Sequence, residues 1–239
     1  MNICLFGGTF DPIHRGHLEI ARAAARRYNL QRIEFIVSDI PPHKRRQPIT
    51  PFLHRYAMVA LALRGHKAFF PSTLEAPDVR NPESQVHYSI ETVRRVKRSL
   101  KKSDRLFFLI GMDAFVDIAT WREPEALLRE CEFIVVSRPG FRLADIGRAL
   151  PPALRPSSSV LKALGRTRPA GELVHAGVTI HLLDKVNVSI SATTVRRAVA
   201  QGRSLGKLVP AEVAEYIKKM NLYREESQSP RLQSNLQNH

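Results

Sequence analysis

Two histidines, His14 and His17, lie three residues apart in a loop between a short apolar run and the start of a helical pattern. The apolar run, residues 3–6, is followed by Gly7 and Gly8, whose missing side chains let the backbone approach a ligand closely. A spacing of three residues places both imidazoles on one side of a turn. Such a loop suits a catalytic metal, a phosphate or simple turn chemistry.

Known motifs narrow these choices. The sequence contains no G-x-x-x-x-G-K-[ST] phosphate loop, and the stretch GGTFDP does not match the dinucleotide-binding pattern G-x-G-x-x-G. The histidines occur as HRGH rather than H-E-x-x-H, with Arg15 where a cation opposes metal binding. We therefore expect no metal ligands from this loop.

A phosphate site fits the loop better. The start of a helix offers free N–H groups and about half a positive charge, which attract anions. Gly16 leaves the first turn uncrowded, and the ring N–H groups of His14 and His17 add donors that gain charge if the rings are protonated. The alternative is that His14 caps the turn and His17 is merely an exposed residue at the helix start.

A second helix start, in the stretch SISATTVRR, has similar properties. Ser191 is well placed as an N-cap, Thr193 and Thr194 occupy the first turn, and Arg196 follows one turn in. The segment thus presents hydroxyl donors and a cation beside a second set of free N–H groups. Ordinary helix capping is the alternative interpretation.

The two helix starts together resemble the nucleotidyltransferase superfamily, whose signatures are a (T/H)-x-G-H loop and an I-S-x-T-x-x-R helix start. Further stretches make the chain similar to the bacterial nicotinate-nucleotide adenylyltransferase family: PPHK (residues 41–44), HYSIETV (87–93), IGMDAFVDIATW (110–121) and SRPG (137–140). The chain departs from the pattern of this family at Ser89, where threonine is usual, and at His87, where serine is usual. The resemblance covers residues 1–140 and about 178–223.

The resemblance implies transfer of the adenylyl group of ATP to nicotinate mononucleotide, which gives nicotinate adenine dinucleotide and pyrophosphate in NAD biosynthesis. It implies an in-line displacement without a protein nucleophile, in which the enzyme positions the substrates and stabilises charge. Mg²⁺ is expected on the ATP phosphates, without a tightly bound organic cofactor. Sister enzymes that act on nicotinamide mononucleotide or phosphopantetheine are the alternatives.

Site residues follow from the same resemblance. It implies catalytic roles for His14, His17 and Arg196, with His17 at the α-phosphate and Arg196 at the β- and γ-phosphates. The alternative for Trp121 is a core tryptophan, and the alternative for Arg138 is a salt bridge to an acidic neighbour. The ATP-binding residues that the resemblance implies are Gly7, Gly8, Thr9, Phe10, Gly16, Gly111, Asp113 at the ribose, Ser191, Thr193 and Thr194. Those implied for the mononucleotide are Lys44, Tyr88, Ser89, Trp121 and Arg138.

Charge and composition bound the partners. The chain has 37 basic and 22 acidic residues, a net charge of +15, which calls for nucleic acid, a membrane surface or a highly phosphorylated small molecule. We expect ATP and nicotinate mononucleotide as substrates and no specific nucleic acid, because aromatic residues do not interleave with Lys and Arg.

Location and assembly are less constrained by the sequence. No apolar stretch approaches the roughly 20 residues that span a bilayer. Cys4 and Cys131 lie in or beside apolar runs, so we expect reduced thiols in a cytoplasmic protein without membrane association. The sequence is compatible with a monomer and with a homo-oligomer.

Alternating strand and helix patterns must position these residues. The alternation predicts an α/β fold, namely a doubly wound, mostly parallel sheet of the Rossmann-like nucleotidyltransferase kind with a C-terminal helical segment. Ligands of such folds bind at the carboxyl ends of the strands, where the histidine loop falls. Strand-like runs occur at residues 2–6, 32–38, 68–72, 105–111, 132–138 and 178–184, and helical patterns at 16–30, 50–65, 89–102, 124–131, 191–202 and 210–221.

Boundaries can also be predicted. Thr50 is predicted to cap the second helix, with Pro51 in its first position. We expect one domain at residues 1–224, with an insertion at about 141–177 where the periodic pattern is lost. The polar residues 225–239 are predicted to form a disordered tail.

Overall fold

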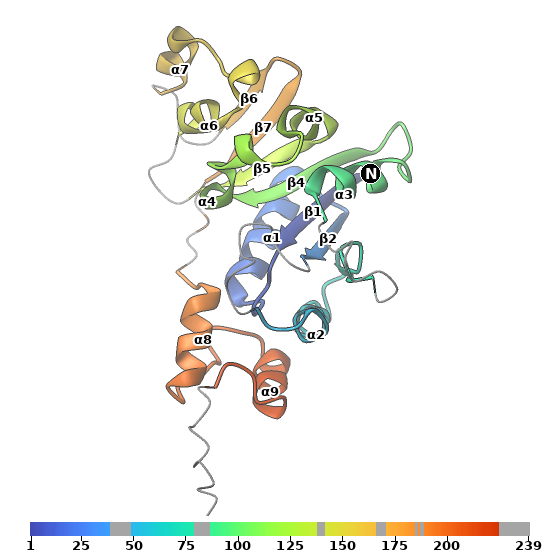
Figure 1. Ribbon diagram of the computed structural model, residues 1–239, viewed down its shortest axis with the longest axis vertical. Helices are drawn as coiled ribbons and strands as arrows, with labels where there is room; N and C mark the ends of the chain where they lie inside the picture. Colours follow the sequence, from blue (N-terminus) through green and yellow to red (C-terminus); the bar gives the residue numbers. More distant parts are fainter. Residues whose placement is uncertain are drawn as a thin grey trace, which may run out of the picture.

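One seven-stranded sheet runs through the described part of the chain, in the order β3-β2-β1-β4-β5-β7-β6 (Figure 1). The computed structural model describes residues 1–38, 49–78, 87–137, 142–165, 171–184, 186 and 189–224. Neighbouring strands pair in parallel, except that β6 is antiparallel to β7. The prediction of a mostly parallel sheet is confirmed. The strands are β1 (Asn2–Gly8), β2 (Arg32–Val37), β3 (Phe69–Ser72), β4 (Arg105–Gly111), β5 (Glu132–Val136), β6 (Gly171–His175) and β7 (Val178–Leu183).

Helices cover both faces of the sheet, as a doubly wound fold requires. The strand periodicity of two sends Cys4 and Phe6 of β1 into one apolar cluster, and Ile3 and Leu5 into the other. The helices are α1 (Arg15–Tyr28), α2 (Phe52–Ala62), α3 (Ser89–Lys97), α4 (Met112–Phe115), α5 (Pro124–Glu130), α6 (Leu143–Ala149), α7 (Ser158–Leu164), α8 (Ala192–Ala200) and α9 (Ala211–Lys219), with 3-10 turns η3 (Ile118–Thr120) and η4 (Pro152–Leu154).

Each apolar cluster belongs to one layer of helices. The first cluster joins the sheet to α1, α2, α8 and α9, and the second joins it to α3, α4, α5 and α6. Figure 1 shows α8 and α9 together at one end of the molecule and α6 and α7 at the other. Among the described helices, none is both long and apolar enough to cross a membrane.

The strand order reverses beside β1. From β1 the chain moves outward through β2 to β3, and then returns to β4 on the other side of β1. The connections that follow β1 and β4 therefore diverge at their carboxyl ends, which leaves room for a ligand there. The histidine loop and the segment after Gly111 both lie at this point.

The structure corrects several local predictions. Strand β1 continues through Gly8 instead of stopping at Phe6, because β2 remains paired with it to that residue. Helix α2 begins at Phe52, and Pro51 is its N-cap in place of Thr50. The predicted tail, residues 225–239, lies outside the described residues.

The segment at 141–177 carries more regular structure than its sequence pattern indicates. It contains α6, η4, α7 and β6, all short. Leu143, Ile146 and Leu154 are buried in the second apolar cluster. Packing against the sheet stabilises α6 and η4, which local propensity alone does not, and α7 packs in turn on α6.

Candidate active site

The two histidines of the loop after β1 form a stacked pair at the start of α1. His14 is the N-cap of the helix, and its ring centroid lies 3.7 Å from that of His17 at an interplanar angle of 21°. The backbone N–H of His14 donates to Nδ1 of His17 over 3.2 Å. Because Nδ1 of His17 accepts this bond, a neutral His17 ring carries its proton on Nε2 and can donate it to a ligand.

Burial keeps both imidazoles neutral near pH 7. Loss of hydration lowers the pKa of His14 to about 4. The pKa of His17 is also well below its usual value, first through burial and then through the neighbouring His14. The predicted donors are therefore neutral N–H groups at physiological pH rather than cations.

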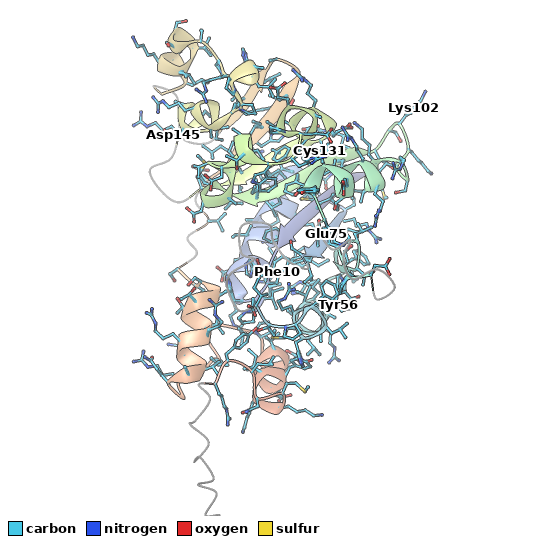
Figure 2. All side chains as sticks on the ribbon, viewed as in Figure 1. Phe10, Tyr56, Glu75, Lys102, Cys131 and Asp145 are labelled. Carbon is cyan, nitrogen blue, oxygen red and sulfur yellow. The ribbon has the colours of Figure 1, made fainter. Side chains whose placement is uncertain are left out.

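Phe10 supports this pair from the core. Its side chain, labelled in Figure 2, is buried. Its backbone is left-handed with φ of 47°, and its ring centroid lies 5.0 Å from that of His17. A Cβ atom on Gly8 would come within 2.9 Å of the Phe10 ring. Glycine is required at position 8 so that this ring can pack beneath the loop, while Thr9 lies half-buried between them.

Asp11 connects the loop to three distant parts of the chain. Its carbonyl accepts a hydrogen bond from Nη1 of Arg196 over 2.7 Å. Its carboxyl oxygens accept bonds from the hydroxyl of Tyr223 over 2.6 Å and from the backbone N–H of Thr50 over 3.3 Å. The two predicted anion-binding segments, around His14 and around Arg196, are thus brought together.

The start of α8 has the predicted cap. The Ser191 hydroxyl accepts a bond from the backbone N–H of Thr194 over 3.1 Å and lies 2.8 Å from the Thr194 hydroxyl. Nη2 of Arg196 donates to the Thr193 hydroxyl over 3.3 Å. Ser191, Thr193 and Thr194 are all exposed, so their hydroxyl groups and the end of the helix are accessible to a ligand.

A buried arginine that the sequence interpretation missed holds the surrounding loops. Arg55 of α2 is only 1% exposed. Its guanidinium donates to the carbonyl oxygens of Thr50, Thr9 and Ser38, over 2.7, 2.9 and 2.5 Å. One side chain therefore joins the segments that follow β1 and β2 to the start of α2.

Glu75, also missed, lies beside these loops (Figure 2). Its carboxyl accepts a bond from the Thr92 hydroxyl of α3 over 2.8 Å. Burial raises the pKa of Glu75 to about 7, although hydrogen bonds from Thr92 and Ser38 and the charge of Arg95 oppose the shift. Nothing in its sequence context, EAPD, distinguished it from an ordinary loop acid.

Of the residues expected at the mononucleotide, Tyr88, Ser89 and Trp121 lie on the other face of the sheet. Tyr88 is the N-cap of α3 and Ser89 is its first residue. Tyr88 and Trp121 are half-buried and pack against the second apolar cluster. The Trp121 ring meets that of Phe108 edge-on, with centroids 6.3 Å apart.

The remaining expected site residues are distributed as follows. Gly111 ends β4, and Asp113 is exposed in the short helix α4 that follows it. Gly7 lies in β1 beside Phe108, and Gly16 is buried in the first turn of α1. Lys44 and Arg138 lie outside the described residues.

Buried polar atoms without partners mark the same edge of the sheet. Among the described residues these are Nδ1 of His14, Nε2 of His87 and Oγ of Ser137. Such atoms are costly to leave unpaired. His14 follows β1, Ser137 follows β5 and His87 precedes α3, so all three belong to the loops where a ligand is expected to bind.

Known proteins share this sequence and fold. Residues 5–198 match the family model described as Cytidylyltransferase-like. A protein of Citrifermentans bemidjiense named "Probable nicotinate-nucleotide adenylyltransferase" is 39% identical over 223 residues, which are 93% of this chain and 98% of the relative. A protein of Pelobacter propionicus with the same name is 36% identical, over 94% of this chain and 99% of its own length.

A solved structure agrees in fold. The nicotinic acid mononucleotide adenylyltransferase of Plasmodium falciparum, in complex with NaAD, superposes with a TM-score of 0.64 at 22% identity, over 93% of this chain and 97% of that one. The sheet order and the two helix starts define a nucleotidyltransferase. The chain belongs to the cytidylyltransferase-like family, and within it to the nicotinate-nucleotide adenylyltransferases that these relatives represent.

Proposed function

We propose that this protein transfers the adenylyl group of ATP to nicotinate mononucleotide, which yields nicotinate adenine dinucleotide and pyrophosphate. The observation that carries the proposal is the 2.7 Å hydrogen bond from Arg196 to the Asp11 carbonyl. It joins two helix starts that each offer donors to a polyphosphate. The names of relatives that are 36–39% identical over nearly the whole chain support the same reaction.

The reaction is an in-line displacement. A phosphate oxygen of the mononucleotide forms a bond to the α-phosphorus of ATP, and the bond from that phosphorus to the oxygen bridging to the β-phosphate breaks. Pyrophosphate leaves with the electron pair of the broken bond. No protein nucleophile is needed, so the enzyme contributes positioning and stabilisation of charge on the phosphate oxygens.

We assign the α-phosphate to the histidine loop. Nε2–H of His17 donates to an α-phosphate oxygen, and the free N–H groups at the start of α1 act with it. His14, stacked on His17, holds that ring in place and offers its own ring N–H. These neutral donors stabilise the transferring group without a proton transfer.

We assign the β- and γ-phosphates to the start of α8, through Ser191, Thr193, Thr194 and Arg196. The nucleoside part of ATP lies along Gly7, Gly8, Thr9, Phe10 and Gly16, and Asp113 beyond Gly111 binds the ribose. This places ATP across the carboxyl ends of β1 and β4, where the strand order reverses.

We assign the mononucleotide to the opposite side of these strand ends. Trp121 provides a platform for the pyridine ring, with Tyr88 and Ser89 beside it and Lys44 and Arg138 as cations for its anionic groups. Half-burial of Trp121 against Phe108 leaves part of the indole face for such a contact.

Mg²⁺ enters with ATP, bound to the phosphate oxygens. The described residues contain no group of three or more His, Cys, Asp or Glu side chains that could hold a metal ion. We place the reaction in the cytoplasm, since Cys4 and Cys131 are free thiols.

The test incubates the purified protein with ATP, Mg²⁺ and either nicotinate mononucleotide or nicotinamide mononucleotide, and follows pyrophosphate release. We expect faster release with nicotinate mononucleotide. Faster release with the amide would assign the other substrate, and phosphopantetheine serves as a third acceptor. Absence of release with all three acceptors would refute the proposed reaction.

A further inference from the structure

The last described turn of the chain contacts the loop that carries the histidines. Tyr223 follows α9 and packs against the first apolar cluster. Its hydroxyl donates to Oδ1 of Asp11 over 2.6 Å, across 212 residues of sequence. Asp11 is 7% exposed, so this bond is largely protected from water.

Asp11 determines where the histidine pair lies. Only residues 12 and 13 separate it from His14, and Ile13 is completely buried. A displacement of Asp11 is therefore transmitted to the stacked rings of His14 and His17 instead of being absorbed by a flexible linker. Because the hydroxyl of Tyr223 donates to one carboxyl oxygen and the N–H of Thr50 to the other, the carboxyl is held from both sides.

We propose that Tyr223 is a positioning residue for adenylyl transfer: through Asp11 it holds the histidine loop in the geometry that the reaction needs. This inference rests on the proposed function. The Tyr223 hydroxyl donates to Asp11, a residue that we assign to no substrate, and it also interacts with Thr50 and with the charge of Arg196. The route that we propose runs through Asp11. Burial and the Asp11 carboxyl both raise the pKa of Tyr223, so the hydroxyl keeps the proton that it donates throughout the neutral range.

The test is the variant Tyr223→Phe, which removes one hydroxyl and keeps the ring. We expect kcat to fall by about tenfold or more, since small displacements of catalytic groups are costly, while KM for the mononucleotide stays within about twofold. A matched control is Tyr216→Phe. The Tyr216 hydroxyl lies 2.9 Å from Nδ1 of His54, so its hydrogen bond joins α9 to α2 and not to Asp11.

The control separates positioning from stability. Both variants lose one hydrogen bond that docks the C-terminal helices, so both are expected to lower the melting temperature by a few degrees. Only Tyr223→Phe is expected to lower kcat. Equal losses of kcat in the two variants, or an unchanged kcat in Tyr223→Phe, would overturn the proposal.

A double variant tests the route through Asp11. If Tyr223 acts only through that carboxyl, Asp11→Asn combined with Tyr223→Phe reduces kcat no further than Asp11→Asn alone. If the double variant instead reduced kcat by the product of the two separate factors, Tyr223 would act by another route, and the proposal would be refuted.

Hydrogen exchange gives a readout that does not need activity. In Tyr223→Phe we expect the amides of residues 10–17 to exchange faster than in the wild type, and in Tyr216→Phe to exchange at the wild-type rate. Unchanged exchange in Tyr223→Phe would overturn the positioning role. If the wild type released no pyrophosphate while the exchange result held, the reaction assignment would fail and the link between Tyr223 and the loop would stand.

Discussion

Among single residues, the stacked histidines carry most of the proposed chemistry, and their geometry also serves the helix. Nδ1 of His17 accepts a hydrogen bond from the backbone N–H of His14. This N–H lies at the N-cap and has no partner within the helix ladder of α1. The same bond directs Nε2–H of His17 away from the backbone. The two interpretations from the sequence, capping and ligand binding, are therefore compatible, because each uses a different ring nitrogen.

The first prediction concerns His17. We expect His17→Ala to lower kcat by about 10² or more, as loss of a preorganised transition-state donor does. Loss of the bond at the helix start costs only about 1 kcal/mol of stability. Steady-state kinetics and thermal melting measure the two effects separately. A near-normal kcat with a lowered melting temperature would leave His17 with a capping role only.

The second prediction concerns pH. His14 stays neutral in the folded protein down to about pH 4 but ionises near pH 6.5 when unfolded. The unfolded state thus binds more protons between these values, so stability is lost as the pH falls through this window. His14→Asn keeps a good N-cap and removes the titration.

Denaturant unfolding at pH 7 and pH 5 measures this effect. Between these two pH values we expect the wild type to lose about 2 kcal/mol more than His14→Asn. Equal losses would mean that the His14 ring gains its proton as easily when folded as when unfolded.

Among the secondary structure elements, the site depends on how α1, α2 and α8 begin. Helices α1 and α8 present their free N–H groups at the site, and α2 supplies Arg55 from its buried side. Arg55 joins three carbonyl oxygens that the sheet leaves without strand partners. An arginine suits this position because its guanidinium directs several N–H groups in one plane.

The third prediction follows from that arrangement. Arg55→Met leaves three carbonyl groups without this donor, each at a cost of about 1–3 kcal/mol, so we expect stability to fall by about 3 kcal/mol or more. The matched control is Arg64→Met, at an exposed position just after the same helix, with an expected change within about 0.5 kcal/mol. Denaturant unfolding of both variants measures the change in the free energy of unfolding. Equally small changes in the two variants would contradict the role given to Arg55.

In the whole molecule, the carboxyl ends and the amino ends of the strands have different roles. The carboxyl ends hold the candidate site, whereas Arg105 and Glu132, the first residues of β4 and β5, form a two-contact ion pair at the amino ends. His181 joins this pair and lies 2.8 Å from Glu132 and 3.3 Å from Glu172. We propose that residues 1–224 form one domain, since the carboxyl ends that hold the candidate site and the amino ends that hold this ion pair belong to a single sheet.

The fourth prediction uses this separation. Burial opposes the charge of Glu132, but Arg105 and His181 overcome it and lower the pKa of Glu132. Glu132→Gln should lower stability by about 1 kcal/mol, because the pair is partly exposed, and leave kcat/KM unchanged. Glu212→Gln, an exposed acid on α9, serves as the control. A loss of kcat/KM in Glu132→Gln would show that the amino ends of the strands are coupled to the site at their carboxyl ends.

The sequence by itself determined the alternation of strands and helices, the two helix starts and the family, because each rests on periodicity or on a contiguous motif. It did not predict α6, β6 or α7: α6 buries Leu143 and Ile146 against the sheet, β6 pairs with β7, and α7 packs on α6. Nor did it indicate Arg55, Glu75 or Tyr223. Their roles arise from hydrogen bonds to residues far away in the chain, and no local pattern records such a partner. Only the tertiary structure brought Asp11, Arg196 and Tyr223 together, since the sheet must close and the C-terminal helices must pack before these groups meet.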